Sequence, residues 1–115
     1  LAAENEFAYA SYDTYPVSVF HCLIIPKRHV KDYFDLSDDE VIACNNLIKK
    51  IKEEILLKDP AVKGFNIGTN VGEVSGQSIL HCHIHLIPRR KGDVENPQGG
   101  VRSVIPLKQH YKRKV

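Results

Sequence analysis

The chain has 115 residues, of which 43% are hydrophobic and 26% charged, the balance of a single globular domain. A formal net charge of +2 gives no electrostatic reason to expect nucleic acid as a partner, and no apolar run reaches the ~20 residues of a membrane-spanning helix. Three cysteines without a close pair argue against a disulfide framework and favour a cytoplasmic protein. Because the sequence begins with Leu1 and contains no methionine, we expect its natural N-terminus to lie upstream.

Two strands are predicted in the first part of the chain. Residues 6–13 alternate loosely between polar and apolar side chains and are rich in aromatic rings, which is typical of a strand. Residues 20–26 form a short apolar run that ends at Pro26, which predicts a second strand.

A long amphipathic helix is predicted next. Ser37 can cap its first turn, and Glu40, three residues later, can complete a capping box. Apolar residues then recur at helical spacing to about residue 58, just before Pro60; they are Val41, Cys44, Ile48, Ile51 and Ile55.

The second part of the chain predicts a hairpin followed by a tail. Residues 63–69 and 78–88 are expected to be strands joined by a glycine-bearing turn. The segment 92–115 is expected to be a loop-rich tail with one more short strand at 101–106. The sum is a single α+β domain over residues 1–115, an antiparallel sheet of about five strands with one main helix packed on it.

Half of the six histidines fall within five positions, at His81, His83 and His85. Side chains alternate between the faces of a strand, so these three are expected on one face, roughly 6.6 to 7 Å apart at the backbone. The opposite face is apolar and should pack beneath the helix; it consists of Cys82, Ile84 and Leu86. The histidine face must therefore border a polar site.

Three interpretations compete for this face: hydrogen-bonded histidines on a sheet, a metal site, or catalysis by a nucleophilic histidine. A zinc ion needs a tetrahedral array, whereas three in-line histidines span too far to close on one ion easily, and Cys82 points the other way. A neutral imidazole attacks well near pH 7 when a hydrogen bond fixes its tautomer. The pattern favours nucleophilic catalysis without a metal.

Several segments together resemble the histidine-triad (HIT) superfamily. HCHIHLI at 81–87 resembles the family signature of three histidines alternating with apolar residues, and FHCLIIPKRH at 20–29 resembles its strand, proline, basic pair and histidine. GQS at 76–78 matches as well, as do Asn70 and Asp13 at their distances from Gln77 and His21. The resemblance covers essentially the whole chain. The family's usual opening, with the cysteine pair of many bacterial members, would lie upstream.

The resemblance implies a nucleotide hydrolase or transferase that attacks the α-phosphorus. The middle histidine, His83, would form a nucleotidyl-histidine intermediate. His81 and His85 would orient the site and contact phosphate, and His21 is implied as a fourth active-site histidine. No cofactor is implied; a divalent cation would enter only with a polyphosphate substrate.

Further positions are implied to bind substrate. Asp13 would accept hydrogen bonds from both ribose hydroxyls, as a carboxylate can. Asn70, Gln77 and Ser78 would donate to phosphate oxygens, and Leu23 would contact the substrate.

The C-terminal segments resemble one branch of the family more than another. PRRKGD at 88–93 and NPQGGVRSVIP at 96–106 resemble the branch that acts on diadenosine polyphosphates, with Arg89 holding phosphates beyond the scissile bond. A nucleoside phosphoramidase, which cleaves AMP–amine bonds, is the alternative. A nucleotide-binding regulatory module without turnover is a second class of function.

One position departs from the family pattern. The family usually places glycine directly before the strand histidine, where this chain has Phe20 before His21. Glycine permits a tight turn that a Cβ opposes. A phenylalanine could alter the turn or crowd the substrate pocket, although we expect His21 still to reach the triad.

Partners are also implied by the resemblance. Family members are commonly homodimers that pair through a sheet edge and the main helix, so we expect a homodimer. The other expected partner is a small nucleotide substrate, and neither nucleic acid nor a membrane is expected.

Overall fold

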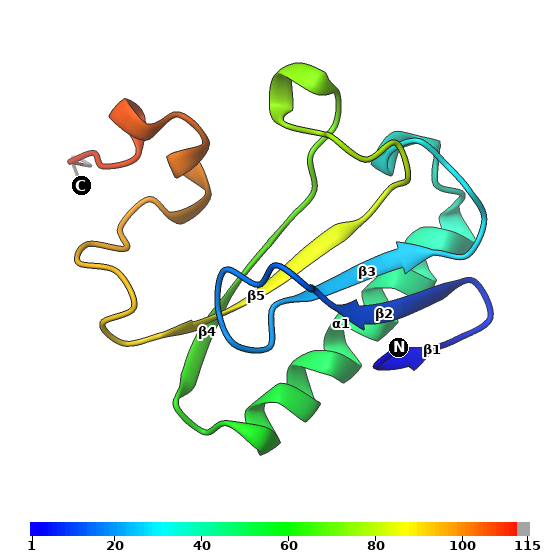
Figure 1. Cartoon of the computed structure of the whole chain (residues 1–115), viewed down its shortest axis with the longest axis horizontal. Coiled ribbons are helices and arrows are strands. Elements are labelled where there is room, and N and C mark those ends of the chain that lie inside the picture. Colours follow the sequence, from blue (N-terminus) through cyan, green and yellow to red (C-terminus); the bar gives the residue numbers. More distant parts are fainter. Residues whose placement is uncertain (113–115) are drawn as a thin grey trace.

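Five antiparallel strands form one sheet in the computed structural model of the chain, which describes residues 1–112 (Figure 1). In the sheet order β1-β2-β3-β5-β4 the strands are β1 (Ala3–Glu4), β2 (Ala8–Tyr12), β3 (Cys22–Pro26), β5 (Ile84–Arg90) and β4 (Val62–Gly68). The predicted α+β class and the number of strands are confirmed.

The fifth strand is not where the sequence predicted it. The short β1 supplies it, whereas the tail forms two 3-10 helices, η3 (Gly100–Val104) and η4 (Pro106–Lys108). Gly99 and Gly100 have φ of 91° and 48°, outside the strand region, and Pro106 lacks the N–H that a ladder needs. The last predicted tail residues, 113–115, lie outside the described part of the chain.

Helix α1 (Asp38–Lys58) begins as predicted. The Ser37 hydroxyl accepts the Glu40 N–H at 3.2 Å, and the Glu40 carboxylate accepts the Ser37 N–H at 2.8 Å. Glu40 is buried and also binds Arg28 at 2.7 Å, which lowers the pKa of its carboxyl to about 2. Because this cap uses only neighbouring residues and one nearby arginine, a sequence pattern could predict it.

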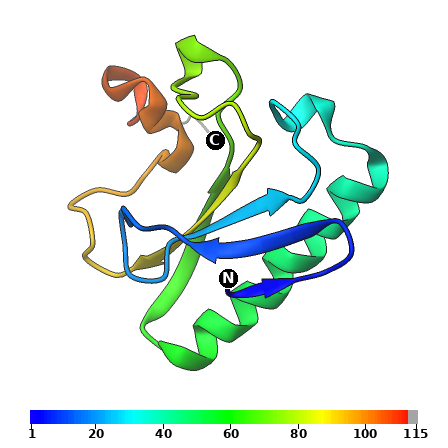
Figure 2. The same cartoon turned by 45° about the vertical axis from the view of Figure 1, so that its right-hand side comes forward.

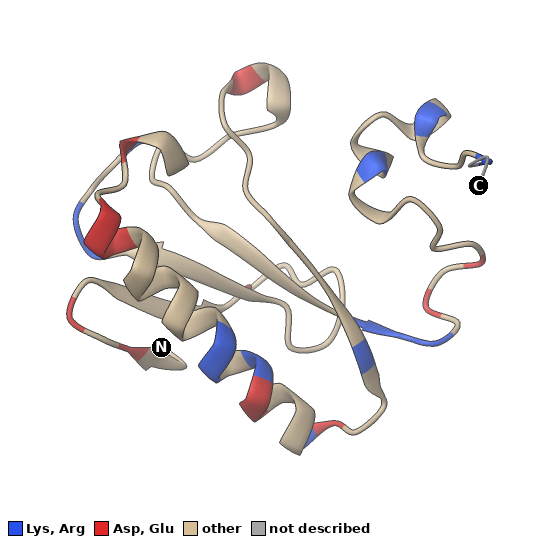
Figure 3. Ribbon diagram, turned by 180° about the vertical axis from the view of Figure 1, so that it is seen from behind, with Lys and Arg blue, Asp and Glu red and all other residues tan. Residues whose placement is uncertain are grey.

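The core lies between α1 and one face of the sheet, on the helix side seen in Figure 3. Each fully buried Ile or Leu contributes roughly 1.5–3 kcal/mol. The fully buried set includes Ile24, Leu47, Ile51, Ile55 and Leu86. Cys22, Cys44 and Cys82 are buried beside them as free thiols, and burial raises the pKa of each to about 11.

Strand β5 starts six residues later than the predicted strand. It begins at Ile84, although the predicted strand began at residue 78. Its neighbour β4 ends at Gly68, opposite His85, so the residues before Ile84 have no partner on that side. His81 and His83 therefore lie just outside the ladder, where the Cys82 N–H bonds the Val30 carbonyl at 2.8 Å.

The other face of the sheet is bordered by two irregular segments. The β4–β5 connection, with its short helix η2 (Glu73–Ser75), and the C-terminal tail both lie on the side away from α1 (Figure 2). The remaining short helix, η1 (Tyr33–Asp35), precedes α1. Among the described helices, none combines the length and the apolar character that a bilayer crossing requires.

Candidate active site

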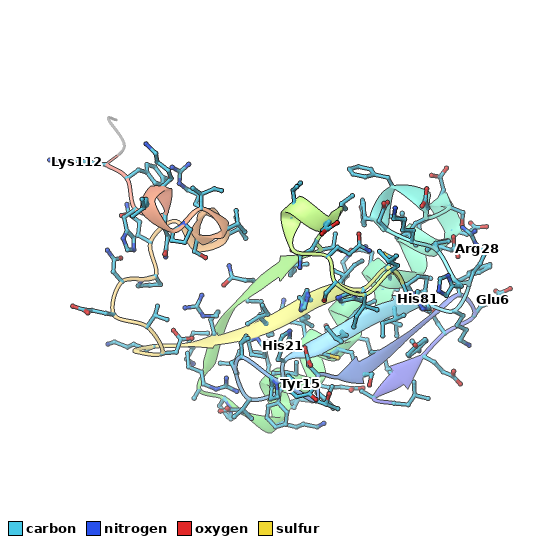
Figure 4. All side chains as sticks on the ribbon, turned by 45° about the horizontal axis from the view of Figure 1, so that its top comes forward. Glu6, Tyr15, His21, Arg28, His81 and Lys112 are labelled. Atoms are coloured by element: carbon cyan, nitrogen blue, oxygen red, sulfur yellow. The ribbon has the colours of Figure 1, made fainter. Side chains whose placement is uncertain are left out.

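His21 and His85 meet on the open face of the sheet. Strand β3 pairs with β5 so that Leu23 lies opposite His85, and His21 directly precedes β3. The His21 Nε2 is 2.9 Å from the His85 Nδ1, and their ring centroids are 5.1 Å apart. Figure 4 shows His21 at the start of β3, near Tyr15.

The backbone determines the tautomers of this pair. The Val17 N–H donates to the His21 Nδ1 at 3.1 Å, so a neutral His21 carries its proton on Nε2. That proton is donated to the His85 Nδ1, which leaves the His85 proton on Nε2. Burial lowers the pKa of both histidines, and Asp13, whose Oδ2 is 3.6 Å from the His21 Nε2, opposes this shift. The neutral pair is therefore the favoured state.

His83 has the opposite tautomer. Its Nδ1 lies 2.9 Å from the His81 carbonyl oxygen, which can only accept, so Nδ1 carries the proton. The other ring nitrogen, Nε2, keeps its lone pair. The ring packs edge-on against His85 at a centroid distance of 5.2 Å. The Thr69 hydroxyl donates to the His83 carbonyl at 2.7 Å and fixes the backbone there.

His81 anchors the segment at the other end of β3. Its Nε2 donates to the Pro26 carbonyl at 3.0 Å, and its ring stacks on His29 at 4.7 Å. Figure 4 places His81 near Arg28, far along β3 from His21. Each of the three triad histidines is thus bound to the protein at one ring nitrogen, which is Nε2 in His81 and Nδ1 in His83 and His85.

The other side chains predicted to contact substrate differ in their exposure and in the hydrogen bonds that they already make. Asp13 is partly buried, and its Oδ1 accepts the Tyr15 N–H at 2.8 Å, which leaves further lone pairs on the carboxylate. Leu23 is half-buried on the same face as His85. Asn70 lines a cavity beside His85, and Ser78 is exposed.

Gln77 is the exception among the predicted phosphate donors. It is 5% exposed, and its amide nitrogen donates to the Lys31 carbonyl at 2.6 Å and the Ile79 carbonyl at 3.1 Å. Its amide oxygen accepts the Gly72 N–H at 3.0 Å. Both donors are used within the protein, so Gln77 holds the loop in place.

A cavity of about 980 Å³ extends from His21 and His85 toward the tail. Arg89 lines it, but its guanidinium binds both oxygens of Asp93, at 2.7 and 2.9 Å, and the Asn66 side chain at 2.7 Å. Glu95 is a second carboxylate in the wall. Among the described residues that line the cavity, the charged side chains are therefore two carboxylates and one guanidinium.

Phe20 alters the turn without crowding this cavity. It is the only non-glycine residue with positive φ, at 73°, among residues 1–112. For an L-residue this conformation costs about 1–2 kcal/mol. Its ring packs against the core, and the ring centroid is 5.9 Å from that of Tyr12. Phe20 does not belong to the residues that line the cavity.

The HIT domain pattern matches residues 1–92. The chain belongs to the HIT-domain family. A HIT-like protein of Methanocaldococcus jannaschii is 39% identical over 110 residues, which are 95% of this chain and 83% of that protein. The structure is similar to the crystal structure of a hypothetical histidine triad nucleotide-binding protein of Sulfolobus tokodaii, with a TM-score of 0.71 and 35% sequence identity. The match covers 83% of this chain and 63% of the Sulfolobus chain.

A named enzyme is also among the relatives of this HIT protein. An adenosine 5′-monophosphoramidase of Candida albicans is 31% identical over 90 residues, 76% of this chain and 59% of the yeast protein. The chain thus spans less than two thirds of the yeast enzyme and of the Sulfolobus protein. Membership of the family supports nucleotide hydrolase or transferase activity in general.

One group of potential metal ligands occurs among residues 1–112 of this HIT protein. Atoms of Asp13, His21 and His85 lie within 4.8 Å of one another. The Val17 N–H, however, keeps the lone pair of a neutral His21 on Nδ1, so Nε2 presents a proton to any cation. These residues therefore do not fit a metal ion unless that hydrogen bond breaks.

Several residues in the site were not predicted from the sequence. Val17 binds His21 through its backbone N–H, which no side-chain pattern can reveal. Thr69 and Asn66 act through the pairing of β4 with β5, and only a correct register would have placed them near His83 and Arg89.

Proposed function

We propose that this HIT protein hydrolyses nucleotides attached at the α-phosphate to a leaving group, with His83 as the nucleophile. The observation that carries the proposal is the hydrogen bond from the His83 Nδ1 to the His81 carbonyl, because it leaves the lone pair on Nε2. In that tautomer a histidine is ready to attack without losing a proton first.

The reaction would proceed in two displacements. The His83 Nε2 attacks phosphorus, an N–P bond forms, and the bond from phosphorus to the leaving group breaks, with the leaving atom taking a proton from water. Water then attacks phosphorus, the N–P bond breaks, and a proton passes to solvent while His83 regains its lone pair. The His85 Nε2–H would donate to the charged phosphate oxygens, as electrostatic catalysis requires.

Three further side chains would hold the nucleotide. Asp13 would bind the ribose hydroxyls through its remaining lone pairs, and Leu23 would offer an apolar surface beside His85. Asn70 and Ser78 would donate to phosphate. Gln77 would support their loop from within.

The cavity charges support an amine as the leaving group. The sequence favoured dinucleoside polyphosphates because of its basic run, but Arg89 is paired with Asp93, and Arg90 with Asp59 at 2.9 Å. With Glu95 also in the wall, a polyphosphate would meet like charge. An amine, which becomes an ammonium ion once it has taken up a proton on leaving, would be attracted. We therefore place AMP–amine compounds first and dinucleoside polyphosphates second.

The test is the release of AMP, measured by chromatography, from an AMP–lysine phosphoramidate and from diadenosine tetraphosphate, each with and without EDTA. We expect wild type to cleave the amine compound faster and without sensitivity to EDTA. His83→Ala should lower kcat by about 10³-fold or more. His110→Ala, in the exposed tail, is the matched control and should cleave like wild type.

Two results would contradict the proposal. Equal AMP release by His83→Ala and wild type would remove His83 as the nucleophile. Tight AMP binding without release from either compound would favour the regulatory module, and faster cleavage of the tetraphosphate would reverse the order of substrates.

A further inference from the structure

Three successive residues tie the turn that presents His21 to other elements, the first two to strand β5 and the third to the end of helix α1. The His21 N–H closes the turn onto the Ser18 carbonyl at 3.1 Å. The Ser18 hydroxyl donates to the Pro88 carbonyl in β5 at 2.8 Å, and the Val19 carbonyl accepts from Arg90 at 3.0 Å. Phe20, the third, is attached through its ring.

The Phe20 ring belongs to a small cluster at the end of helix α1. Lys58, the last residue of the helix, places its Nζ 5.6 Å from the Phe20 ring centroid and 5.2 Å from that of Tyr12. The same Nζ donates to the Tyr12 hydroxyl at 3.0 Å. An ammonium group over two rings is attracted to both, so Lys58 links the rings to the helix.

This cluster joins the two residues that precede site residues. Tyr12 comes directly before Asp13, and Phe20 directly before His21. Both rings lie toward the helix side of the sheet, so neither reaches the cavity. Any effect of Phe20 on chemistry must therefore pass through the backbone of the turn.

The backbone of this turn also determines the tautomers of the His21–His85 pair. Val17 and His21 bracket the turn, and in this conformation of the turn the Val17 N–H reaches the His21 Nδ1 at 3.1 Å. Glycine could adopt a φ of 73° without strain but would be equally free to leave it, whereas a packed ring holds the conformation.

We propose that Phe20 is a positioning residue for the His21–His85 pair, acting through the cluster that its ring forms with Tyr12 and Lys58. The ring holds the left-handed turn, the turn holds the Val17 N–H on His21, and this hydrogen bond fixes which nitrogens of His21 and His85 carry protons. The kinetic part of the inference rests on the proposed function, but the structural part does not.

The test compares Phe20→Gly and Lys58→Met with wild type and with Lys52→Met, a control at an exposed lysine of the same helix. Imidazole ¹⁵N shifts of the resting protein report the tautomer of each histidine without any substrate. We expect His21 of wild type and of the control to hold its proton on Nε2 alone. In Phe20→Gly it should become a mixture of tautomers, and Lys58→Met should shift it the same way to a smaller extent.

Kinetics then separate positioning from stability. We expect Phe20→Gly to lower kcat about tenfold with little change in KM, since the pair is misoriented but the substrate contacts remain. Because glycine fits the backbone, this variant should fold. Unchanged histidine tautomers in a folded Phe20→Gly would overturn the proposal, even if its thermal stability fell. If wild type shows no turnover, the proposed function fails, and the imidazole spectra still decide this inference.

Discussion

Two histidines of the site, His21 and His85, are joined by a hydrogen bond that depends on their protonation. Burial lowers the pKa of His21 and of His85 below the ordinary value of 6.5, and for His85 the neighbouring His21 and His83 add to the shift. The hydrogen bond between the two rings needs a lone pair on the His85 Nδ1, which protonation removes. Both the burial and the hydrogen bond therefore favour the neutral forms of His21 and His85.

This leads to a prediction on stability. As the pH falls through about 6.5, these histidines bind protons in the unfolded chain, whereas the folded pair stays neutral because its pKa values are lower. The free energy of unfolding should therefore fall with the pH until the folded-state pKa values are passed. Urea unfolding at several pH values between about 5 and 8 measures this slope. Replacing both histidines with glutamine should flatten it. A slope that is flat or reversed in the wild type would contradict the prediction.

The sequence could single out a group of candidate histidines, but it could not predict the hydrogen bond that each ring nitrogen makes. The triad and His21 stand out by spacing and by resemblance. The tautomers depend on the Val17 N–H and on the carbonyls of His81 and Pro26. Because almost every residue has these backbone groups, the sequence does not show which of them contact a histidine. The pairing of Arg89 with Asp93 was hidden for a different reason, since a basic run gives no sign of which carboxylates fold back onto it.

Among the elements, helix α1 was predicted well, whereas β1 was missed and the start of β5 was placed six residues too early. The helix has its signals within its own sequence, from the Ser37–Glu40 capping box to the residue before Pro60. The start of β5 depends on where β4 ends, and β4 is a separate segment that ends at Gly68. The left-handed Phe20 was foreseen as a difficulty, but its packing against the end of the helix was not.

The loop before the triad should depend on Gln77 for its structure. Gln77→Leu would leave the Gly72 N–H and the Lys31 and Ile79 carbonyls without their partner, so we expect a loss of about 1–3 kcal/mol in the free energy of unfolding. Urea unfolding measures it. Ser78→Ala, at the exposed neighbour, should change stability by less than about 0.5 kcal/mol and instead raise KM. Equal stability of the two variants would argue against this role for Gln77.

At the scale of the whole molecule, one sheet edge and the tail carry exposed apolar side chains. Among the described strands, β4 pairs with β5 alone, and Ile67 on β4 is 51% exposed. The tail exposes Val101, Val104 and Leu107. An open sheet edge and a nearby apolar surface are features through which chains associate, and the homodimer stays a prediction.

We predict that the protein sediments with about twice the 13.0 kDa mass of the chain at micromolar concentration. Ile67→Lys should shift it toward the monomer, because a charge would be buried against the partner. Phe34→Lys, at an exposed ring in η1, is the control and should leave the mass unchanged. A monomeric wild type would show that neither the edge nor the tail is covered by a second copy.

The three enclosed thiols make the protein convenient for site-directed labelling. Cys22, Cys44 and Cys82 are the only cysteines of the chain, and with a pKa of about 11 and no exposed sulfur they offer maleimide dyes almost no thiolate at neutral pH. A cysteine introduced at Leu107, which is 95% exposed, would then take up a fluorophore alone. A second one at exposed Leu57, in helix α1, would make a donor–acceptor pair that reports the distance between the tail and the helix.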